Sequence, residues 1–583
     1  MQRLFGAVAP PDEQPGSLQT NLEAPATAAE GGIVVALVGR PFWRGRPEAS
    51  ADDKMAREIL SAYQRCGSRL LDTLHGSFAL AIVEPFRGVA LLALDRMGIQ
   101  RLAYAETPGG LVFSTSAEAV ARQVSRSPAL DRQAILDFLF FHMVPAPGTI
   151  FTGVRKLPAA TLAEYSNGRL RLSQYWTPEF IEDRPGDYDG LARELNASLR
   201  TAVLSAAPGA ATGAFLSGGL DSSTVAGVLS MVSPVPARTF SIGFGFPDYD
   251  ELSFARIANA RFNCEGHEYD IKADDIVASF ASIAEAYDEP FGNSSALPAY
   301  YCAKLAREHG VTHLLAGDGG DELFAGNSRY ADQIVFQHYG RAPAAVRTLL
   351  EAGLRVCPSV LSRGVIRKAK GYVAKANTPL PDRLEAWNFL LQLGMAEVLD
   401  PGFLAAVSPE GPLQHMRAVY GSAPARSELN RLLYYDWRFT LADNDLRKVE
   451  AMCDLAGVAV SYPMLHPDVV EMSTRVPPQM KMPGTKLRDF YKRAMQGFLP
   501  DEIIHKKKHG FGLPFGLWLQ QSRELRELVL GNLADLRRRH VVRVDFIDRL
   551  LDLHGADDAR YYGVFVWVLA MLEQWLKAHE IST

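Results

Sequence analysis

The sequence lacks paired cysteines, long apolar runs and a recognisable targeting segment. Its 583 residues include only five cysteines, at positions 66, 264, 302, 357 and 453, and none of them forms a C-x-x-C pair. An odd number of widely spaced cysteines argues against a disulfide framework or a zinc site and fits a reducing compartment. The most apolar run, Val564–Leu572, is too short to cross a bilayer, and the first residues lack the apolar core of a signal peptide. We therefore expect a cytoplasmic protein with no membrane contact.

The chain also lacks a strong excess of charge and a lysine-containing phosphate loop. With 61 Lys and Arg against 66 Asp and Glu, its net charge is −5, so we expect no nucleic acid partner. The pattern G-x-x-x-x-G-K-[ST] is absent, so a nucleotide is not held here as it is in P-loop enzymes. A hydrophobic content of 48% is that of an ordinary globular protein, and the length predicts two domains.

The first 176 residues are predicted to be rich in β-structure. Short apolar runs bounded by turn residues predict strands at 33–38, 78–83 and 89–94, and residues 53–66 have helical periodicity. Residues 177–188 are acidic and contain two prolines and a glycine, a composition typical of a linker.

The pattern changes after the linker. Strand-like runs at 213–216, 239–244 and 311–315 alternate with helical patterns at 190–206, 251–262 and 296–309. This alternation predicts a parallel sheet flanked by helices. From residue 330 onward the pattern is mostly helical, and we expect no strands there.

The stretch Leu216–Ser223 has the composition of a phosphate-binding loop between a strand and a helix. Gly218 and Gly219 let the backbone approach an anion, and the hydroxyls of Ser217, Ser222 and Ser223 can donate hydrogen bonds. Asp221 lies inside the loop, where its carboxylate would repel a phosphate unless a cation lay between them. The loop therefore predicts polyphosphate binding through magnesium.

A second loop, Ala316–Phe324, follows the strand expected at 311–315 and carries Asp318 and Asp321. Because ligands bind at the carboxyl ends of parallel strands, this loop should face the first one. Two acidic loops suit oxygen coordination of magnesium. The alternative is a plain turn, since Asp and Gly are common in turns.

A serine-rich loop without the P-loop lysine suits a pyrophosphate leaving group. The expected reaction is cleavage between the α- and β-phosphates of ATP with adenylation of a carboxylate. A cation must stabilise the departing charge, and Lys448 and Lys486 are the candidates. For either lysine, a surface salt bridge is the alternative interpretation.

The motifs of this chain resemble, in type and order, those of glutamine-dependent asparagine synthetases. They are Leu4–Gly6, His75–Ala79, Asp95–Gly98, Val144–Pro147, Ser217–Ser223, Asp288–Phe291, Gly317–Phe324, Lys448–Met452, Gly484–Arg488 and His509–Pro514. The resemblance spans nearly the whole chain. It implies an α+β glutaminase-like β-sandwich of the N-terminal nucleophile hydrolase type at 1–176, and a linker at 177–188. An α/β ATP-pyrophosphatase synthetase domain, with a parallel sheet and a helical C-terminal part, is implied at 189–583.

The resemblance also implies roles for individual residues. Asp221 and Asp321 take the magnesium-ligand positions, and Lys486 takes the position of a lysine that contacts the phosphates. Asp318 stands where asparagine synthetases have a glutamate and β-lactam synthetases have a tyrosine, so its role is open. The adenine and ribose would lie against Leu216, Ile242, Ala316 and Gly317.

The first domain departs from the family pattern at its reactive positions. The family uses a cysteine at position 2 to attack glutamine, whereas this chain has Gln2, which has no nucleophilic atom. The glutamine-gripping segment corresponds to Val38–Trp43, and the amine-binding aspartate falls on Met55. We therefore expect no glutaminase activity. In the second domain, Ser461 and His466 replace an arginine and an aspartate; His466 is either a base or a structural turn residue.

An amide-forming enzyme without an ammonia source must take its amine from the substrate. β-Lactam-type synthetases and the macrolactam synthetases of lasso peptides are relatives of this kind, and the lasso-peptide cyclase is the main expectation. Its partners would be a precursor core peptide, a leader peptidase and a leader-binding protein. The alternatives are an asparagine synthetase that uses ammonia or acts on another small acid, and a non-catalytic scaffold that binds nucleotide or peptide.

Overall fold

Two antiparallel sheets face each other in the first part of the chain. The computed structural model describes residues 3–8, 24–46, 52–183, 186–207, 209, 211–247, 249–356, 365–506, 512–556 and 558–581. The smaller sheet has the order β1 (Phe5–Val8), β7 (Gly110–Ser114), β6 (Ala103–Thr107) and β8 (Arg155–Lys156). The larger has the order β10 (Arg169–Gln174), β9 (Thr161–Ser166), β5 (Val89–Leu94), β4 (Leu74–Glu84), β3 (Ile33–Trp43) and β2 (Ala26–Glu30).

The side chains of β4 alternate between two cores, as the period of two of a strand requires. Ala79, Ala81 and Val83 pack in the core between the sheets. Phe78 and Leu80 face the opposite core, under helix α1 (Asp53–Cys66). This arrangement confirms the predicted sandwich, the helix at 53–66 and the strands at 33–38, 78–83 and 89–94.

A five-stranded parallel sheet forms the centre of the second part. Its order is β13 (Glu265–Asp270), β12 (Arg238–Gly243), β11 (Thr212–Phe215), β14 (His313–Leu315) and β15 (Ala459–Ser461). The three predicted strands are confirmed as β11, β12 and β14. The expectation of no strand after residue 330 is wrong, because β15 closes one edge. With only three residues, β15 is too short for any periodicity to reveal it.

Helices cover this sheet and fill the rest of the chain. The predicted helices appear as α4 (Tyr188–Ala206), α6 (Leu252–Phe262) and α8 (Ala296–Glu308). The others are α2 (Ala117–Val124), α3 (Arg132–Phe141), α5 (Leu220–Val232), α7 (Ala273–Ala286), α9 (Gly320–Phe324), α10 (Ser328–Arg341), α11 (Ala344–Val356), α12 (Val365–Asn377), α13 (Phe389–Leu393), α14 (Met395–Val398), α15 (Pro401–Leu404), α16 (Gly411–Gly421), α17 (Glu428–Asp436), η5 (Trp437–Asp445, a π-helix), α18 (Leu446–Ala456), α19 (Pro467–Arg475), α20 (Pro478–Lys481), α21 (Asp489–Ala494), α22 (Asp501–His505), α23 (Phe515–Gln521), α24 (Arg523–Leu536), α25 (Val544–Ala556) and α26 (Ala559–Ala578).

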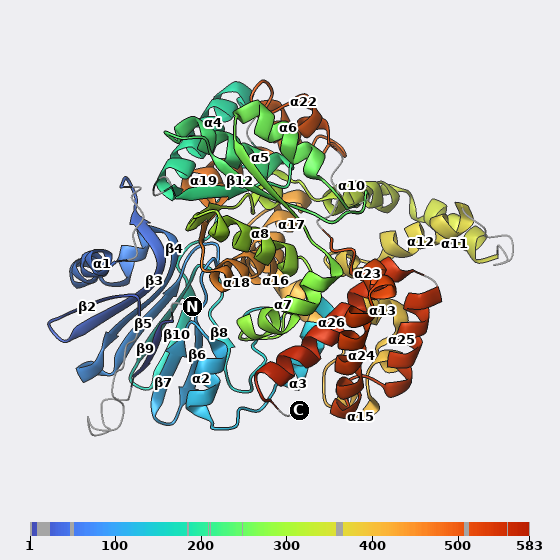
Figure 1. Ribbon diagram of the computed structural model, residues 1–583, viewed down its shortest axis with the longest axis horizontal. Coiled ribbons are helices and arrows are strands. Elements are labelled where there is room, and N and C mark those ends of the chain that lie inside the picture. The colour runs from blue at the N-terminus through green and yellow to red at the C-terminus, as the bar shows by residue number, and fades with distance from the viewer. Residues whose placement is uncertain are drawn as a thin grey trace.

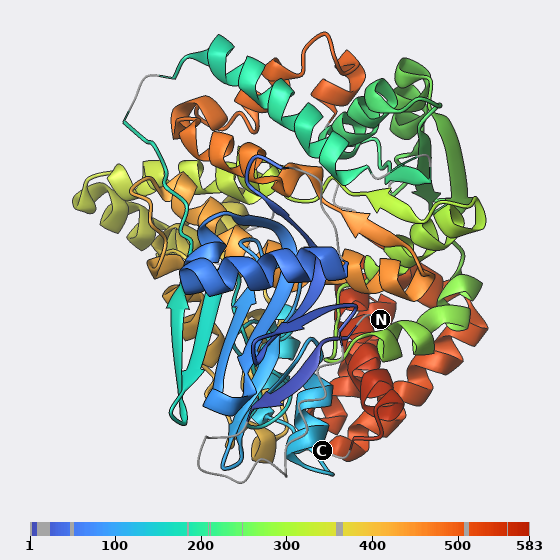
Figure 2. The same ribbon diagram turned by 90° about the vertical axis from the view of Figure 1, so that its left-hand side faces the viewer.

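The two parts lie side by side, with the β-sandwich against the helices of the second part (Figures 1 and 2). Helices α11 and α12 extend outward from the body on the opposite side (Figure 1). Among the helices described, none combines the length and the apolarity that crossing a membrane requires. The apolar α26 instead packs in the protein core, where Trp575 donates a hydrogen bond from Nε1 to the Tyr287 carbonyl at 2.9 Å.

The expected linker is held against the second part by hydrogen bonds. The backbone N–H of Ile181 donates to the Thr474 carbonyl at 3.0 Å. The Glu182 carboxylate accepts hydrogen bonds from the Ser427 hydroxyl at 2.7 Å and the Asn430 amide at 2.8 Å. Residues 181 and 182 of the expected linker are therefore anchored to the second part of the chain.

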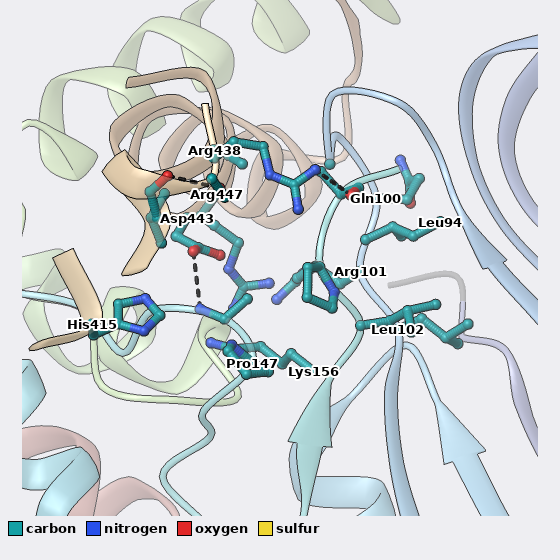
Figure 3. A pocket seen from close by; sticks show the side chains of 18 of the residues that line it. Leu94, Gln100, Arg101, Leu102, Pro147, Lys156, His415, Arg438, Asp443 and Arg447 are labelled. Atoms are coloured by element: carbon teal, nitrogen blue, oxygen red, sulfur yellow. Dashed lines mark hydrogen bonds between the residues drawn. The ribbon is translucent and has the colours of Figure 1, made fainter. Parts of the chain in front are cut away.

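A cavity of about 320 Å³ lies between the two parts (Figure 3). Its walls come from the first domain (residues 94–102 and 146–159), from α16, and from the continuous helix η5–α18. The first domain therefore encloses a space together with the second one.

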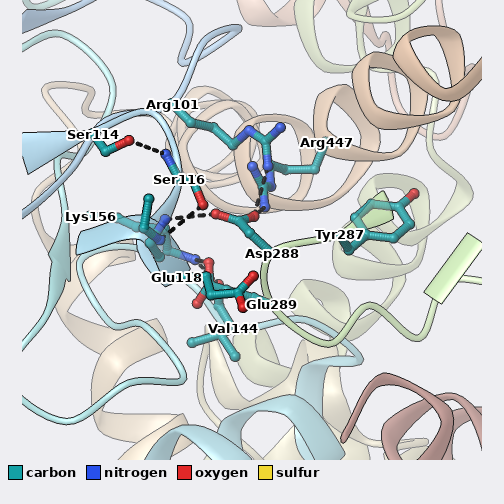
Figure 4. A network of polar contacts seen from close by, with 12 residues as sticks. Arg101, Ser114, Ser116, Glu118, Val144, Lys156, Tyr287, Asp288, Glu289 and Arg447 are labelled. Carbon is teal, nitrogen blue, oxygen red and sulfur yellow. Dashed lines mark hydrogen bonds and ion pairs between the residues drawn. The ribbon is translucent and has the colours of Figure 1, made fainter. Parts of the chain in front are cut away.

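Two adjacent carboxylates, Asp288 and Glu289, fasten the domains together next to this cavity (Figure 4). Asp288 accepts hydrogen bonds from Arg101 Nη1 at 2.9 Å, Arg447 Nη2 at 3.0 Å and the Ala117 backbone N–H at 2.8 Å. Glu289 accepts from Lys156 Nζ at 2.8 Å. Burial alone would raise the pKa of Asp288, but Arg101 and Arg447 together hold it well below its usual range. We call this pair of carboxylates the interdomain clamp.

Replacing Asp288 with Asn should strongly destabilise the protein. The substitution leaves two buried guanidinium groups without their counter-charge, at a cost of about 3–5 kcal/mol. Because the folded-state pKa is lowered, this contribution is present at neutral pH and declines only as the pH falls below about 3.9. Urea denaturation at pH 7 and at acidic pH measures both effects.

The matched control is Asp183→Asn, which breaks an ion pair whose two side chains are each 73% exposed. Its denaturation midpoint should stay at the wild-type value. Equal midpoints for the two variants would contradict the role given to the clamp.

Candidate functional site

The carboxyl ends of β11, β12 and β14 lie next to one another and form the floor of the candidate site. Leu216 follows β11, and its N–H donates to the Phe240 carbonyl of β12 at 2.9 Å. Ala316 follows β14, and its N–H donates to the Ser461 carbonyl of β15 at 2.9 Å. Ile242, the last but one residue of strand β12, is also buried. The structure thus brings together the residues that were predicted to line an adenine and ribose site.

The loop after β11 has the close backbone approach that an anion-binding loop needs. Gly218 has φ +69°, and a Cβ at this position would lie 2.6 Å from the Ala255 backbone nitrogen. Only glycine fits there without a shift of the backbone. The Ser217 N–H donates to Ser222 Oγ at 3.2 Å, and the two serine hydroxyls are 3.1 Å apart.

Helix α5 begins at this loop without a side-chain cap. Its N-cap residue, Gly219, has no side chain to satisfy the first backbone N–H groups of the helix. The first intrahelical hydrogen bond runs from the Ser223 N–H to the Gly219 carbonyl at 3.0 Å, so the N–H groups before it and the helix dipole favour an anion at this end.

The second loop packs directly against the first. A Cβ on Gly317 would lie 2.8 Å from the Ser222 backbone nitrogen, so the two loops touch here through backbone atoms. Asp321 lies in the first turn of α9, on the same side as Asp221. The predicted juxtaposition of the two acidic loops is present in the structure.

Arg488 lies between the two carboxylates. Its Nη1 donates to Asp221 Oδ2 at 2.6 Å and to Asp321 Oδ1 at 2.9 Å, and its Nη2 donates to the second oxygen of Asp221. The side chain of Arg488 is only 6% exposed. Burial would lower the pKa of this guanidinium, but the two carboxylates together raise it. Asp221 and Asp321 therefore converge on a single cationic group.

Magnesium fits these two side chains as a partial coordination site. In the part of the chain that the structure describes, no cluster of three or more His, Cys, Asp or Glu residues could hold a metal ion. Two carboxylates that converge on one cation can bind Mg²⁺ when phosphate oxygens and water complete its six oxygen ligands. Arg488 stands at this position in the structure, so a metal ion there would replace the guanidinium.

The two lysines predicted to stabilise leaving-group charge have different surroundings. Lys486 is exposed, and within the described residues its ammonium has no hydrogen-bond or ion-pair partner. Lys448 donates to Asp445 at 2.9 Å and lies near Asp318. Burial raises the pKa of Asp318 to about 6, and the Lys448 ammonium opposes this rise.

Sequence reasoning missed three groups around the site. Arg488 is two residues after Lys486 in the same motif. The resemblance implies a phosphate-contacting lysine, so it points to Lys486 and not to Arg488. Lys506 donates to the Gly218 carbonyl at 3.3 Å and pairs with Glu251 at 2.8 Å. Burial, reinforced by the Asp454 carboxylate, raises the pKa of Glu450 to about 8. Glu450 belonged to a quoted motif, but only its burial distinguishes it.

The segment of the first domain that corresponds to a glutamine site packs against the second domain. In β3, the Phe42 ring stacks on His75 and on His466, with ring centroids 6.0 and 5.3 Å apart. His466 also accepts a hydrogen bond from the Asp468 N–H as the N-cap of α19, which favours its structural interpretation. Met55 lies in the first turn of α1, with its side chain buried. Gln2 lies outside the described residues.

Comparison with known proteins identifies both parts of the chain. The model of the asparagine synthase family matches residues 191–577, and that of the glutamine amidotransferase domain matches residues 50–176. An asparagine synthetase (glutamine-hydrolyzing) 1 of Bacillus subtilis is 24% identical over 87% of this chain and 78% of its own. A putative asparagine synthetase (glutamine-hydrolyzing) of Mycobacterium tuberculosis is 26% identical over 90% of this chain and 80% of its own.

Replacing Arg488 with Met should destabilise the protein in a way that a divalent cation reverses. The variant leaves Asp221 and Asp321 facing each other without their shared counter-charge, a cost of about 3–5 kcal/mol. Millimolar magnesium should restore part of the lost stability by occupying the same position. Thermal unfolding with and without magnesium chloride measures both changes.

Lys486→Met is the matched control, because the same side-chain exchange there removes an exposed ammonium. It should unfold as the wild-type protein does, with or without magnesium. A magnesium response of equal size in both variants would refute the position given to the metal.

Proposed function

The chain belongs to the asparagine synthase family, and from this we propose that it forms amide bonds by adenylating a carboxylate with ATP. The observation that carries the proposal is the convergence of Asp221 and Asp321 on one cationic position beside the open N-terminus of α5. A nucleotide triphosphate bound there would meet backbone donors and carboxylates in the arrangement that a metal-bridged polyphosphate needs.

Asp221 and Asp321 would hold Mg²⁺, which supplies charge neutralisation to the departing pyrophosphate. The chain adds its own cations. Arg488 is held by both carboxylates, and Lys506 lies against the Gly218 carbonyl of the loop. We propose that Arg488, once the metal ion has displaced it from the two carboxylates, contacts the phosphates, the role first assigned to Lys486, because its guanidinium already lies beside the loop.

The proposed reaction has two steps. A substrate carboxylate oxygen attacks the α-phosphorus of ATP, and pyrophosphate leaves with the electron pair of the broken P–O bond. An amine nitrogen then attacks the acyl carbon, AMP leaves, and the nitrogen gives up a proton to form the amide. We propose Glu450 as the base that accepts this proton, because it lies beside Tyr462, which is also close to Asp318, and because its raised pKa suits proton transfer near neutral pH.

We further propose that the amine belongs to the same substrate, which makes the enzyme a lasso-peptide macrolactam synthetase. The support is the domain contact, where Phe42 of the predicted glutamine-gripping segment stacks on His75 and on His466 of the second domain. Attack by the peptide's own N-terminal amine on an adenylated Asp or Glu side chain needs no nitrogen donor. It also gains from the high effective concentration of a tethered group.

Incubation with ATP, magnesium and a core peptide that has a free N-terminal amine tests this proposal. The expected products are AMP, pyrophosphate and a peptide lighter by one water, detected by mass spectrometry. An N-terminally acetylated peptide is the control, because it keeps the carboxylate but has no amine to close a ring. Aspartate with ammonium chloride forms the competing arm, and asparagine production there would replace the cyclase proposal by the activity named for the relatives. If no AMP forms in any of these incubations, the proposed ligase activity is overturned and a non-catalytic scaffold remains.

If Glu450 is the base, turnover should rise with pH between about 7 and 9. A carboxyl group with a pKa of about 8 is mostly protonated at pH 7, and its basic form becomes dominant above pH 8. Glu450→Gln should lower the rate by about 10²–10⁴-fold and flatten the pH profile. The exposed Glu502→Gln is the control and should keep the wild-type profile. A rising limb that survives in Glu450→Gln would exclude this role.

A further inference from the structure

The cavity between the domains has cationic groups set in an apolar wall (Figure 3). Four basic side chains line it, and the only acidic one among its described lining residues is Asp443. The basic residues are Arg101, Lys156, Arg438 and Arg447. The apolar lining is Leu94, Leu102, Ala146, Pro147, Leu157, Pro158, Ala159, Ala418, Val419 and Ala442. A pocket of this kind suits a small molecule with one charged end and one apolar end.

The interdomain clamp leaves part of this positive charge without a full counter-charge. Lys156 is neutralised by Glu289 and also donates to the Val144 carbonyl. Arg101 and Arg447, in contrast, share the single carboxylate Asp288 (Figure 4). Arg438 is hydrogen-bonded to a neutral group, the Ala159 carbonyl.

Arg447 supplies an unpartnered donor at this place. The residue is 8% exposed, and its Nη1 is buried without a hydrogen-bond partner among the described residues. His415, on α16, also has an unpartnered ring nitrogen, Nε2. Buried donors are normally satisfied, so two lining residues that each carry an unsatisfied nitrogen indicate that an acceptor is missing from this region.

Asp443 does not supply this acceptor. Its carboxylate accepts the Ala146 backbone N–H at 2.9 Å, and burial raises the pKa of this group. Arg438, Ala442 and Asp443 all lie on the π-helix η5, an unusual backbone form that is frequent at functional sites.

We propose that this cavity binds a small organic acid, with its carboxylate held by Arg101, Arg438 and Arg447. The apolar body of the ligand lies against Leu102, Pro147 and Val419. Guanidinium groups suit this role because their planar N–H donors match the geometry of a carboxylate. The first domain thereby forms half of a binding site. This inference does not depend on the proposed amide-forming reaction, since it concerns binding alone.

Two sources provide this chemistry, a peptide C-terminus and a free small acid, and they are tested separately. The probe for the first is N-acetylphenylalanine and the probe for the second is phenylacetate. N-acetylphenylalaninamide is the neutral control of the same shape. Isothermal titration of the full chain at low salt should show binding of at least one acid, with the amide about tenfold weaker or more.

Arg438→Gln is the informative variant, because Arg438 is bonded to a backbone carbonyl and takes no part in the clamp. It should weaken acid binding about tenfold, whereas Arg523→Gln, at an 84%-exposed side chain, should not change it. Ala418→Trp should block the cavity from α16 without changing its charge.

Each outcome decides the proposal. Binding of N-acetylphenylalanine but not phenylacetate would assign the site to a peptide C-terminus, and the reverse would assign it to a free acid. No heat with either acid at millimolar concentration would overturn the proposal. Equal binding of the acid and the amide, or wild-type affinity in Arg438→Gln, would overturn it as well.

Discussion

The structure depends on two buried carboxylates, Asp288 and Glu289, which are paired with cations from both domains. Lys156 and Arg101 come from the first domain and Arg447 from the second. Separating the domains would leave charge without a partner in a poorly hydrated interior, and this cost holds the β-sandwich in place. The clamp thereby also fixes the position of α18, because Arg447 and the neighbouring Lys448 lie on that helix. Arg447 lies on the side of α18 that faces the domain interface, and Lys448 lies on the side that faces the candidate site.

The candidate site itself follows from the topology of the parallel sheet. Three strands end side by side, so the loops after β11 and β14 must face each other. Gly317 lets the backbones of the two loops touch, which brings Asp221 and Asp321 to one position. Two carboxylates this close need a cation, and Arg488 provides it in the structure. The Arg488 guanidinium, which neutralises the two carboxylates in this structure, is also close to where a bound polyphosphate would carry its negative charge.

The first domain contributes to the molecule through its surfaces. Phe42, in the segment predicted to correspond to a glutamine site, stacks on His75 and on His466 of the second domain, so this face joins the two domains. Its loops at 98–102 and 146–159 form the walls of the interdomain cavity. This domain encloses half of the cavity and supplies two of the cations that pair with the clamp carboxylates. It therefore has a physical reason to stay attached, independent of any reaction of its own.

The sequence by itself determined the local elements and the order of the motifs. The glycine–serine loop at 216–223, the acidic loop at 316–324 and the strands before them are local patterns, and local sterics and periodicity fix them. It could not reveal β15, whose three residues form a strand only because β14 pairs with them. Nor could it choose between Lys486 and Arg488, two residues apart in one motif, because that choice depends on which side chain is buried between Asp221 and Asp321. The cavity and its unpartnered Arg447 likewise arise only where distant segments meet, since burial and charge balance are properties of the packed chain.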